Sequence, residues 1–439
     1  MRTSFKADDV ELLLKDITGL VDPLGTKERE ARIQSGVHYS EMLPLEYEPS
    51  PKYLAAYYEA VERFSPAVAK AVGTAATRLA QTLPLPVMVS LARAGTSSGV
   101  LIKHYLRRYY GIDAPHYSIS IIRGRGIDKV ALDYILARHS ADQLIFVDGW
   151  VGKGAIKRTL VETLHEYPEV KPRLLVLSDP CGASDITGTS HDLLIPSSLL
   201  NSTVSGLISR TFLRSDIIGT GDFHGAMYYA KWEAADLTYH FIESVEKHFQ
   251  PPAELREFLH TTTTSGKPTL STADGDSSTS SSSTNAETAA IVDTTTSDKH
   301  ALSTANSDRA KDGTADSSTT SSSTNAGAAA STDSTTSGTP TLSTASTTTS
   351  SSKPAGLVEA ERIAADFAIS DINLVKVGIG EATRVLLRRV PKVVLVHDLT
   401  DSINLGHLLT LAKEKGVPIK EYPLQNYLAC GIIQELGDA

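Results

Sequence analysis

The chain has 439 residues, enough for two or three domains, and a formal net charge of −9. This negative balance provides no global cationic field for a nucleic acid or a membrane surface. Two cysteines exclude a disulfide framework, and the N-terminus lacks an apolar stretch of signal-peptide length. Because no 18-residue apolar run occurs either, we expect a cytoplasmic protein without a membrane partner. The oligomeric state is not predictable from the sequence.

A Ser/Thr-rich segment at 261–355 divides the chain. It contains almost no aromatic or large aliphatic residues, so it cannot bury enough apolar surface to offset the entropy cost of ordering. The motif Leu-Ser-Thr-Ala recurs in it without a hydrophobic face, which excludes a solenoid. The composition predicts a disordered linker between two folded regions.

The first 80 residues are predicted to form a helical and loop-rich cap, with Asp8 and Asp9 capping a helix over 10–15. Between 81 and 260, short apolar runs alternate with helical patterns. The predicted order is strand 86–92, helix 98–110, strand 117–122, helix 128–137, strand 143–147, helix 154–165, strand 173–177 and, at the end, helix 234–249. Short buried strands separated by helices indicate an α/β domain with a parallel sheet covered on both faces.

The region 356–439 repeats this pattern on a smaller scale. We expect a helix at 358–367, a glycine-bearing loop at 377–381 that leads into a second helix, a strand at 392–396 and a helix at 403–415. About eighty residues suffice for one α/β/α domain. The sequence therefore predicts two α/β domains of unequal size.

Three loops of the larger domain carry candidate chemistry, because ligands of a doubly wound sheet bind beyond the carboxyl ends of its strands. In 92–99, small residues let backbone N–H groups approach an anion and Arg93 adds a fork of donors. Arg123 and Arg125 lie in the second loop, which could close over a polyanion. In the third, 148–155, Asp148 is followed by a Gly-Lys-Gly turn without the spacing of a P-loop. Together the loops predict a phosphate-binding site with one carboxylate.

This order of loops resembles the type I phosphoribosyltransferases. The resemblance implies that phosphoribosyl pyrophosphate binds with Mg²⁺ held largely by its own phosphates, and that the residues have the following roles. The pyrophosphate would contact Arg93, Ala94, Gly95 and Thr96, and Arg123 and Arg125 would stabilise its departure. Asp148 would accept hydrogen bonds from the ribose hydroxyls. The 5′-phosphate would be bound by Val151, Gly152, Lys153, Gly154 and Ala155. The usual pattern has two adjacent acids, whereas Gly149 stands in the second position here, so one hydroxyl contact is lost.

Segments 33–44, 195–211 and 222–226 look like the StiP family, and the resemblance covers nearly all of residues 1–260. That family is labelled as cysteine proteases, is described as phosphoribosyltransferase-like, and is associated with bacterial tellurium resistance and stress response. Segments 378–384 and 416–419 are similar to the Pelota-type RNA-binding domain that accompanies this family.

The protease label requires an activated thiolate, for which Cys181 is the candidate, with His191 and Asp192 ten residues further on. Cys430 lies in an apolar run and is expected in the core. Neither cysteine has a second sulfur near enough to indicate zinc, and we expect no metal site built from protein ligands.

RNA contact is implied only by the resemblance, since the terminal region has nine Lys/Arg against eleven Asp/Glu. The candidate RNA-binding residues are Gly378, Gly380, Glu381, Arg384 and Arg388. Three functions therefore stay open: a phosphoribosyltransferase-like enzyme with an appended RNA-binding domain, a phosphosugar- or nucleotide-binding regulator without turnover, and a cysteine protease.

Overall fold

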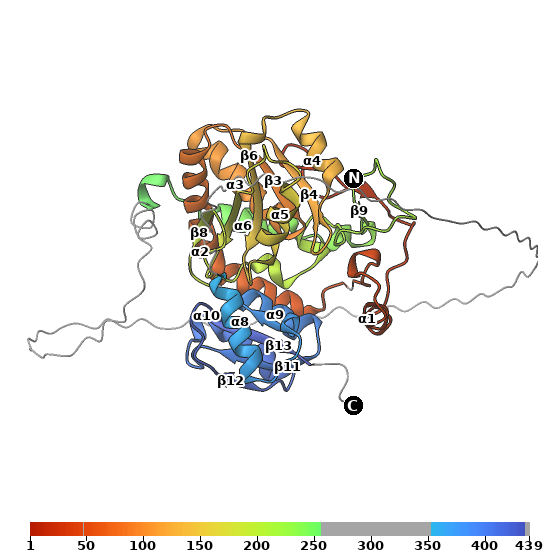
Figure 1. Cartoon of the computed structure of the whole chain (residues 1–439). Coiled ribbons are helices and arrows are strands. Elements are labelled where there is room, and N and C mark those ends of the chain that lie inside the picture. The colour runs from red at the N-terminus through yellow and green to blue at the C-terminus, as the bar shows by residue number, and fades with distance from the viewer. Residues whose placement is uncertain (47, 256–352, 435–439) are drawn as a thin grey trace, which may run out of the picture. The chain divides into compact units, whose positions relative to one another are not determined.

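The structure is a computed structural model that describes residues 1–46, 48–255 and 353–434, which belong to one compact unit (Figure 1). The predicted disordered linker falls outside the described residues, except for its last three positions, 353–355. Within the described ranges, no helix is both long and apolar enough to pass through a lipid bilayer.

The predicted parallel sheet is present. Its strands are β1 (Glu11–Leu12), β4 (His116–Ile122), β3 (Val87–Ala92), β6 (Leu144–Trp150), β7 (Leu174–Ser178) and β8 (Ile186–Thr189), in that spatial order. All neighbours along this path pair in parallel, while β5 (Gly126–Ile127) adds an antiparallel hairpin to β4. The chain leaves β3 toward β4 and later returns to the other side of β3 as β6. The sheet therefore changes direction between β3 and β6, where doubly wound sheets bind ligands.

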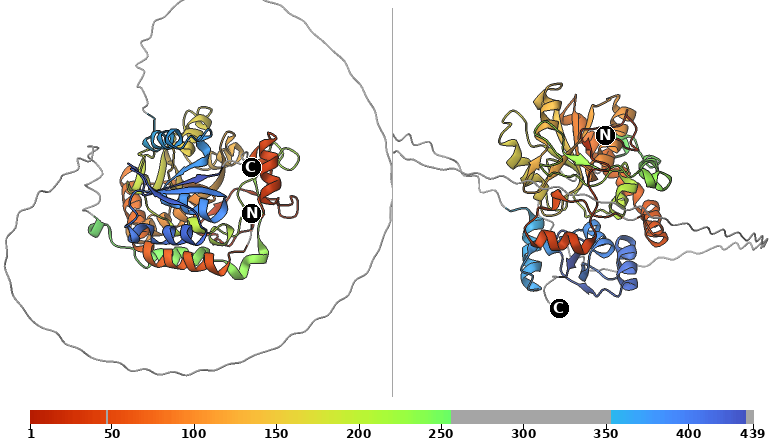
Figure 2. Two further views of the ribbon diagram at one scale, coloured as in Figure 1. Left: turned by 90° about the horizontal axis from the view of Figure 1, so that it is seen from below. Right: turned by 90° about the vertical axis from the view of Figure 1, so that its right-hand side faces the viewer.

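Helices cover both faces of this sheet, as Figures 1 and 2 show from three directions. One face packs on α2 (Pro51–Thr82), α3 (Ala94–Tyr110) and α6 (Thr238–Glu246); the other packs on α4 (Lys129–Leu136) and α5 (Ala155–Leu164). Within β3, Met88 belongs to the first core and Val87 and Val89 to the second. This alternation buries both faces of the strand and explains its continuous apolar sequence. The predicted α/β class is confirmed.

The helix predicted over 10–15 is absent, and this prediction was wrong. The segment is extended: β1 joins β4, the Leu13 N–H donates to the Ser118 carbonyl at 3.0 Å, and β2 (Lys15–Asp16) pairs with β9 (Gly225–Ala226). Leu12, Leu13 and Leu14 are all buried in this arrangement. Tertiary burial of three consecutive leucines outweighs the helix-capping signal of Asp8 and Asp9.

The remaining elements of the first 255 residues are short. They are α1 (Thr26–Gln34) and the 3-10 helices Tyr39–Glu41, Ala141–Gln143, Pro196–Leu199, Ser202–Val204, Ala230–Ala235 and Pro252–Leu255. The single helix predicted at 234–249 is divided into the 3-10 turn Ala230–Ala235 and α6, because Asp236 and Leu237 leave helical geometry.

The C-terminal region is a small α/β/α domain, as predicted. Its sheet has the order β10 (Val375–Val377), β13 (Ala429–Ile433), β11 (Pro391–Val396) and β12 (Ile419–Glu421), with α8 (Ala355–Asp366), the 3-10 turn Ile372–Leu374, α9 (Ile379–Arg388) and α10 (Ser402–Glu414). α8 packs on one face, and α9 and α10 on the other. Cys430 is fully buried in β13, which gives it the core position expected from the sequence.

The C-terminal domain shares its apolar cores with the larger domain. One core joins Leu199 to Ile379 and Leu386, and the other joins Val151 and Cys181 to Tyr427. Polar anchors from α2 reinforce this contact: Lys52 pairs with Glu414 at 2.6 Å, and Arg63 donates to the Ser402 carbonyl at 2.8 Å. The structure thus holds the two domains in direct contact.

Candidate functional site

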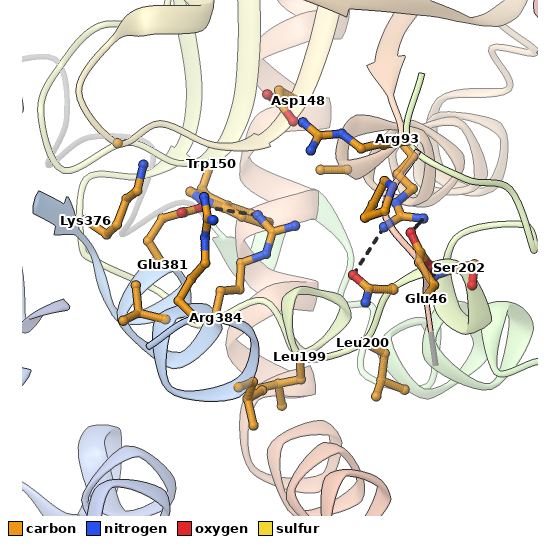
Figure 3. A pocket seen from close by; sticks show the side chains of 18 of the residues that line it. Glu46, Arg93, Asp148, Trp150, Leu199, Leu200, Ser202, Lys376, Glu381 and Arg384 are labelled. Atoms are coloured by element: carbon orange, nitrogen blue, oxygen red, sulfur yellow. Dashed lines mark hydrogen bonds and ion pairs between the residues drawn. The ribbon is translucent and has the colours of Figure 1, made fainter. Parts of the chain in front are cut away.

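A cavity of about 840 Å³ opens at the carboxyl ends of β3 and β6, where the sheet changes direction. This volume is in the range of small-molecule sites. Figure 3 shows Arg93 and Asp148 from the larger domain, and Lys376, Glu381 and Arg384 from the blue ribbon of the C-terminal domain. The cavity is therefore built by both domains.

The cavity is cationic although the chain is acidic. Its lining includes eight basic residues, Arg29, Arg93, Arg123, Lys153, Arg210, Lys376, Arg384 and Arg389, against four acidic ones, Glu46, Glu48, Asp148 and Glu381. Such a gathering of like charges in a partly enclosed space is unfavourable on its own and favours the binding of an anion.

The first predicted loop is shorter than expected, because α3 already begins at Ala94. Arg93 directly precedes α3 and follows a cis peptide bond. The Arg93 guanidinium forms an ion pair at 2.9 Å with Glu46, whose side chain is only 3% exposed. Arg93 also donates to the Ile208 carbonyl at 2.8 Å. Arg93 and Ala94 line the cavity. Gly95 and Thr96 are buried beneath it: a Cβ on Gly95 would lie 2.2 Å from the Val147 carbonyl oxygen, and Thr96 bonds Ser118 at 2.8 Å.

The second predicted loop is a tight hairpin turn between β4 and β5. Arg123 lines the cavity, and its backbone N–H donates to the Tyr39 hydroxyl at 2.8 Å. Arg125 does not line it, because its guanidinium is ion-paired with Glu41 and donates to the Leu213 carbonyl. The structure therefore places one of the two predicted arginines in the cavity.

Asp148, near the end of β6, is half-buried and lines the cavity. Burial raises the pKa of its carboxyl to about 7, although the Gly149 N–H bonds it at 2.8 Å and Arg384 contributes a positive charge. A carboxyl that titrates near neutrality in a cleft is a candidate functional group. Gly149 itself does not line the cavity, and a Cβ there would lie 3.6 Å from the Ser98 hydroxyl oxygen and 3.7 Å from the Ala94 carbonyl oxygen and from Ile195, so no second acid is presented beside Asp148.

The third predicted loop, 151–155, lines the cavity along its whole length and begins α5. Gly154 has a φ of +72°, a left-handed conformation that a glycine adopts without strain. The Lys153 ammonium is already hydrogen-bonded: it donates to the Ile372 carbonyl at 2.6 Å and the Val375 carbonyl at 3.1 Å. Burial, followed by the positive charges of Lys376 and Arg123, lowers the pKa of Lys153 to about 8.

Arg210 is a cavity residue that lies outside the three predicted loops. Burial, followed by the positive charge of Arg29, lowers its pKa to about 10, and Arg93 and Arg123 act in the same direction. Its guanidinium lies over the Tyr39 ring at 4.8 Å. The only signal in the sequence was its position in segment 195–211, one of the segments that carry the family resemblance.

The C-terminal domain supplies the opposite wall. Arg384 lies 5.2 Å from the Trp150 ring centroid and pairs with Glu381 at 3.0 Å (Figure 3). Burial raises the pKa of Glu381, but Arg384 and then Lys376 lower it more, so the net direction is downward. Two predicted RNA-binding residues, Glu381 and Arg384, therefore line this cavity. The side chain of a third, Arg388, lies outside what the structure describes.

Gly378 and Gly380, the other predicted RNA-binding residues, face the larger domain instead. Asp192 lies at the N-terminus of α9, where its Oδ2 accepts the Ile379 N–H at 2.9 Å and the Leu428 N–H at 3.0 Å. Gly378 allows this approach with a φ of +104°. Burial raises the pKa of Asp192 to about 7. The Asp192 carboxyl thus occupies a helix N-terminus, which is a position that favours anions.

Cys181 lies at the domain contact rather than in the cavity lining. In the described part of the chain its hydrogen-bond partners are Asp179, Tyr427 and the Gly356 backbone, none of them a histidine. Burial, followed by the negative charge of Asp179, raises the pKa of the Cys181 thiol to about 12. His191, the base proposed from the sequence, is exposed. This environment suppresses the thiolate that a protease needs.

We therefore expect Cys181 in the folded full-length chain to react with a thiol reagent at pH 8 at least ~100-fold more slowly than a free cysteine, because the thiolate is the reactive form. Labelling followed by peptide mass spectrometry measures this rate. Both cysteines should react once the chain is denatured. Rapid labelling of Cys181 in the native state would contradict the buried, protonated thiol.

Comparison with known proteins identifies a family for each of the two domains. Residues 3–246 match the family described as "Tellurite-like stress resistance cysteine protease StiP", and residues 354–435 match the PELOTA RNA binding domain. A protein of Acinetobacter baylyi named "Cysteine protease StiP" is 37% identical over 261 residues, which cover 56% of this chain and 66% of that relative. The chain thus spans somewhat less than two thirds of that relative's length. This protein belongs to the StiP family and carries a C-terminal Pelota RNA-binding domain.

Proposed function

We propose that the cavity binds phosphoribosyl pyrophosphate or a similar nucleotide-like phosphosugar, and that the chain is a phosphoribosyltransferase-like enzyme. The observation that carries this proposal is the convergence of Arg93, Arg123, Arg210 and the 151–155 loop around Asp148, at the point where the sheet changes direction. Clustered cations fit the phosphates, and one carboxylate fits the hydroxyls of a sugar.

In the proposed reaction the bond between ribose C1 and the pyrophosphate oxygen breaks, and C1 forms a new bond to an acceptor nitrogen, which loses its proton to water. The pyrophosphate leaves with the electron pair of the broken bond. Arg93, Arg123 and Arg210 would stabilise the negative charge that develops on it, because fixed donors in a partly desolvated site act strongly on developing charge. Asp148 would accept hydrogen bonds from the ribose hydroxyls and orient the ring.

Magnesium fits this site only as an ion brought by the ligand. No cluster of three or more His, Cys, Asp or Glu side chains suited to a metal occurs among the residues that the structure describes. Of the cavity carboxylates, Glu46 and Glu381 are ion-paired and Glu48 is exposed, which leaves Asp148 to contact the ion beside the phosphates. Bound in this way, Mg²⁺ would neutralise phosphate charge.

Gly149 supports a second candidate, a phosphosugar-binding regulator without turnover. Its position presents no second carboxylate to the cavity, so the ribose would be held by fewer hydrogen bonds than the transferase pattern provides. Binding would then persist while catalysis is weak or lost. An acceptor screen on a chain that binds the phosphosugar separates these two candidates.

RNA binding by the C-terminal domain is proposed from its family. Contact through Gly378 and Gly380 would require Asp192 to leave the N-terminus of α9. A protease activity is the weakest candidate, because the surroundings of Cys181 raise its pKa and include no hydrogen-bonded histidine among the described residues.

Asp148→Asn tests the phosphosugar proposal. At pH 8 the Asp148 carboxyl, with a pKa of about 7, is mostly ionised and accepts hydroxyl hydrogen bonds better than an amide does. We expect calorimetry on the full-length chain to show at least tenfold weaker binding of phosphoribosyl pyrophosphate with Mg²⁺ (about 1.4 kcal/mol). At pH 6 the wild-type carboxyl is mostly protonated, so the difference between the two chains should shrink.

The matched control is Asp142→Asn, which changes an exposed carboxylate outside the cavity and should leave the affinity unchanged. An Asp148→Asn chain that binds as tightly as wild type at pH 8 would exclude Asp148 from ligand recognition. Absence of binding by the wild-type chain would refute the phosphosugar proposal itself.

A further inference from the structure

Lys153 is the lysine of the 151–155 loop, and the sequence predicts that it binds a phosphate. In the structure its ammonium has other partners. Its ammonium is held by the Ile372 and Val375 carbonyls of the C-terminal domain. These bonds place strand β10 directly beside the loop, and a Cβ on Gly152 would lie 3.8 Å from the Val377 carbonyl oxygen. Lys376 lies between Val375 and Val377 on β10 and lines the same cavity.

The Lys376 ammonium lacks a compensating partner among the described residues. It is half-buried, yet it forms no hydrogen bond or ion pair within the ranges that the structure describes. Glu381, the carboxylate that attracts it, is already paired with Arg384 at 3.0 Å. A half-buried ammonium without a direct partner is costly unless an anion joins it. Lys376 thus lies beside the 151–155 loop, where its positive charge favours the binding of an anion.

The amides of this loop complement the ammonium. Val151 uses its N–H in a bond to the Ser178 carbonyl at 3.0 Å. For Gly152, Lys153 and Gly154, the structure has no backbone N–H bond to any described residue. Amides at the start of α5 and a neighbouring ammonium together favour a terminal phosphate group.

We propose that Lys376, a residue of the C-terminal domain, binds the 5′-phosphate of the phosphosugar at the 151–155 loop. This assignment rests on the proposed function and makes the C-terminal domain part of the small-molecule site. The ligand is a sugar monophosphate group, held between the α5 N-terminus and β10. The pyrophosphate end of the same ligand lies toward Arg93 and Arg210, and Arg93 is on the other side of the cavity from Lys376 (Figure 3).

Two probes separate these ends. Ribose 5-phosphate carries the 5′-phosphate, whereas inorganic pyrophosphate with Mg²⁺ does not. In the full-length chain we expect Lys376→Met to weaken ribose 5-phosphate binding at least tenfold and to change pyrophosphate binding less than twofold. Lys376→Arg keeps the charge and should restore most of the affinity, while a melting curve verifies that each variant folds.

Lys392→Met is the matched control, because Lys392 is an exposed lysine of the same domain outside the cavity lining. It should change neither affinity. Unchanged binding of ribose 5-phosphate by Lys376→Met, or equal weakening of both probes, would overturn the assignment of Lys376 while leaving the phosphosugar proposal intact. A wild-type chain that binds neither probe would overturn both.

Discussion

Replacement of Arg210 by Met is expected to stabilise the unliganded chain while it weakens binding of phosphoribosyl pyrophosphate. Arg210 is a half-buried guanidinium whose pKa is lowered to about 10 by burial and by the charge of Arg29, with Arg93 and Arg123 adding to the effect. Removing it relieves charge repulsion and desolvation, and Met can keep the apolar contact with the Tyr39 ring. We expect the melting temperature to rise by about 2–6 °C.

The same change removes a donor for the pyrophosphate, so we expect a loss of ~100-fold in affinity, or about 2.8 kcal/mol. Calorimetry and melting curves on the full-length chain measure the two effects. Arg138→Met is the control, because Arg138 also lies over a tyrosine, Tyr134, but outside the cavity. A lower melting temperature of Arg210→Met together with unchanged affinity for phosphoribosyl pyrophosphate would mean that Arg210 stabilises the fold and does not contact the ligand.

Gly356→Ala is expected to loosen the contact between the two domains. Gly356 lies in α8, where Ala is favoured by about 1 kcal/mol. However, a Cβ there would lie 2.1 Å from the Tyr427 hydroxyl and 2.6 Å from the Gly152 carbonyl oxygen. The Tyr427 hydroxyl donates to that same carbonyl at 2.7 Å, so neither group can move independently. Movement of the C-terminal domain away from the 151–155 loop relieves the contact with Gly152, and it also frees the Tyr427 hydroxyl, which belongs to the same domain as Gly356, to turn aside from the new methyl group.

Cys181 reports this separation, because Tyr427 and Gly356 cover it in the docked arrangement. In Gly356→Ala we expect thiol labelling of Cys181 to become at least ~10-fold faster and ribose 5-phosphate binding to weaken by a similar factor. Gly406→Ala is the control: it also adds a methyl group within a helix, and its Cβ would meet only the end of the Arg63 side chain at 3.4 Å. Unchanged labelling of Cys181 in Gly356→Ala would contradict the tight contact.

Much of the fold and part of the site follow from the sequence. The apolar runs of β3, β6 and β7 have the length and continuity of strands buried on both faces, which predicts the parallel sheet. Parallel strands end at one edge, so the loops after β3 and β6 had to meet. Arg93, Asp148 and the 151–155 loop are therefore expected together, and the structure has them in one cavity.

The rest of the site depends on tertiary contacts without a local signal. Arg210 comes from a long connection with little regular structure, and Lys376 reaches the cavity from β10, which the bonds of Lys153 to the Ile372 and Val375 carbonyls hold beside the 151–155 loop. Arg125 was expected beside Arg123, but Glu41 holds it outside the cavity lining. None of these partners is near in sequence, and spacing alone cannot identify them.

Calorimetric titration of the full-length chain at pH 8 tests the central claim most directly. The ligands are phosphoribosyl pyrophosphate with Mg²⁺, inorganic pyrophosphate with Mg²⁺, ribose 5-phosphate and an uncharged nucleoside. We predict roughly micromolar binding of phosphoribosyl pyrophosphate, weaker binding of each of its two anionic fragments, and no heat from the nucleoside. Binding of the nucleoside as tight as that of the phosphosugar, or no heat from any anion, would contradict a phosphosugar site in this cavity.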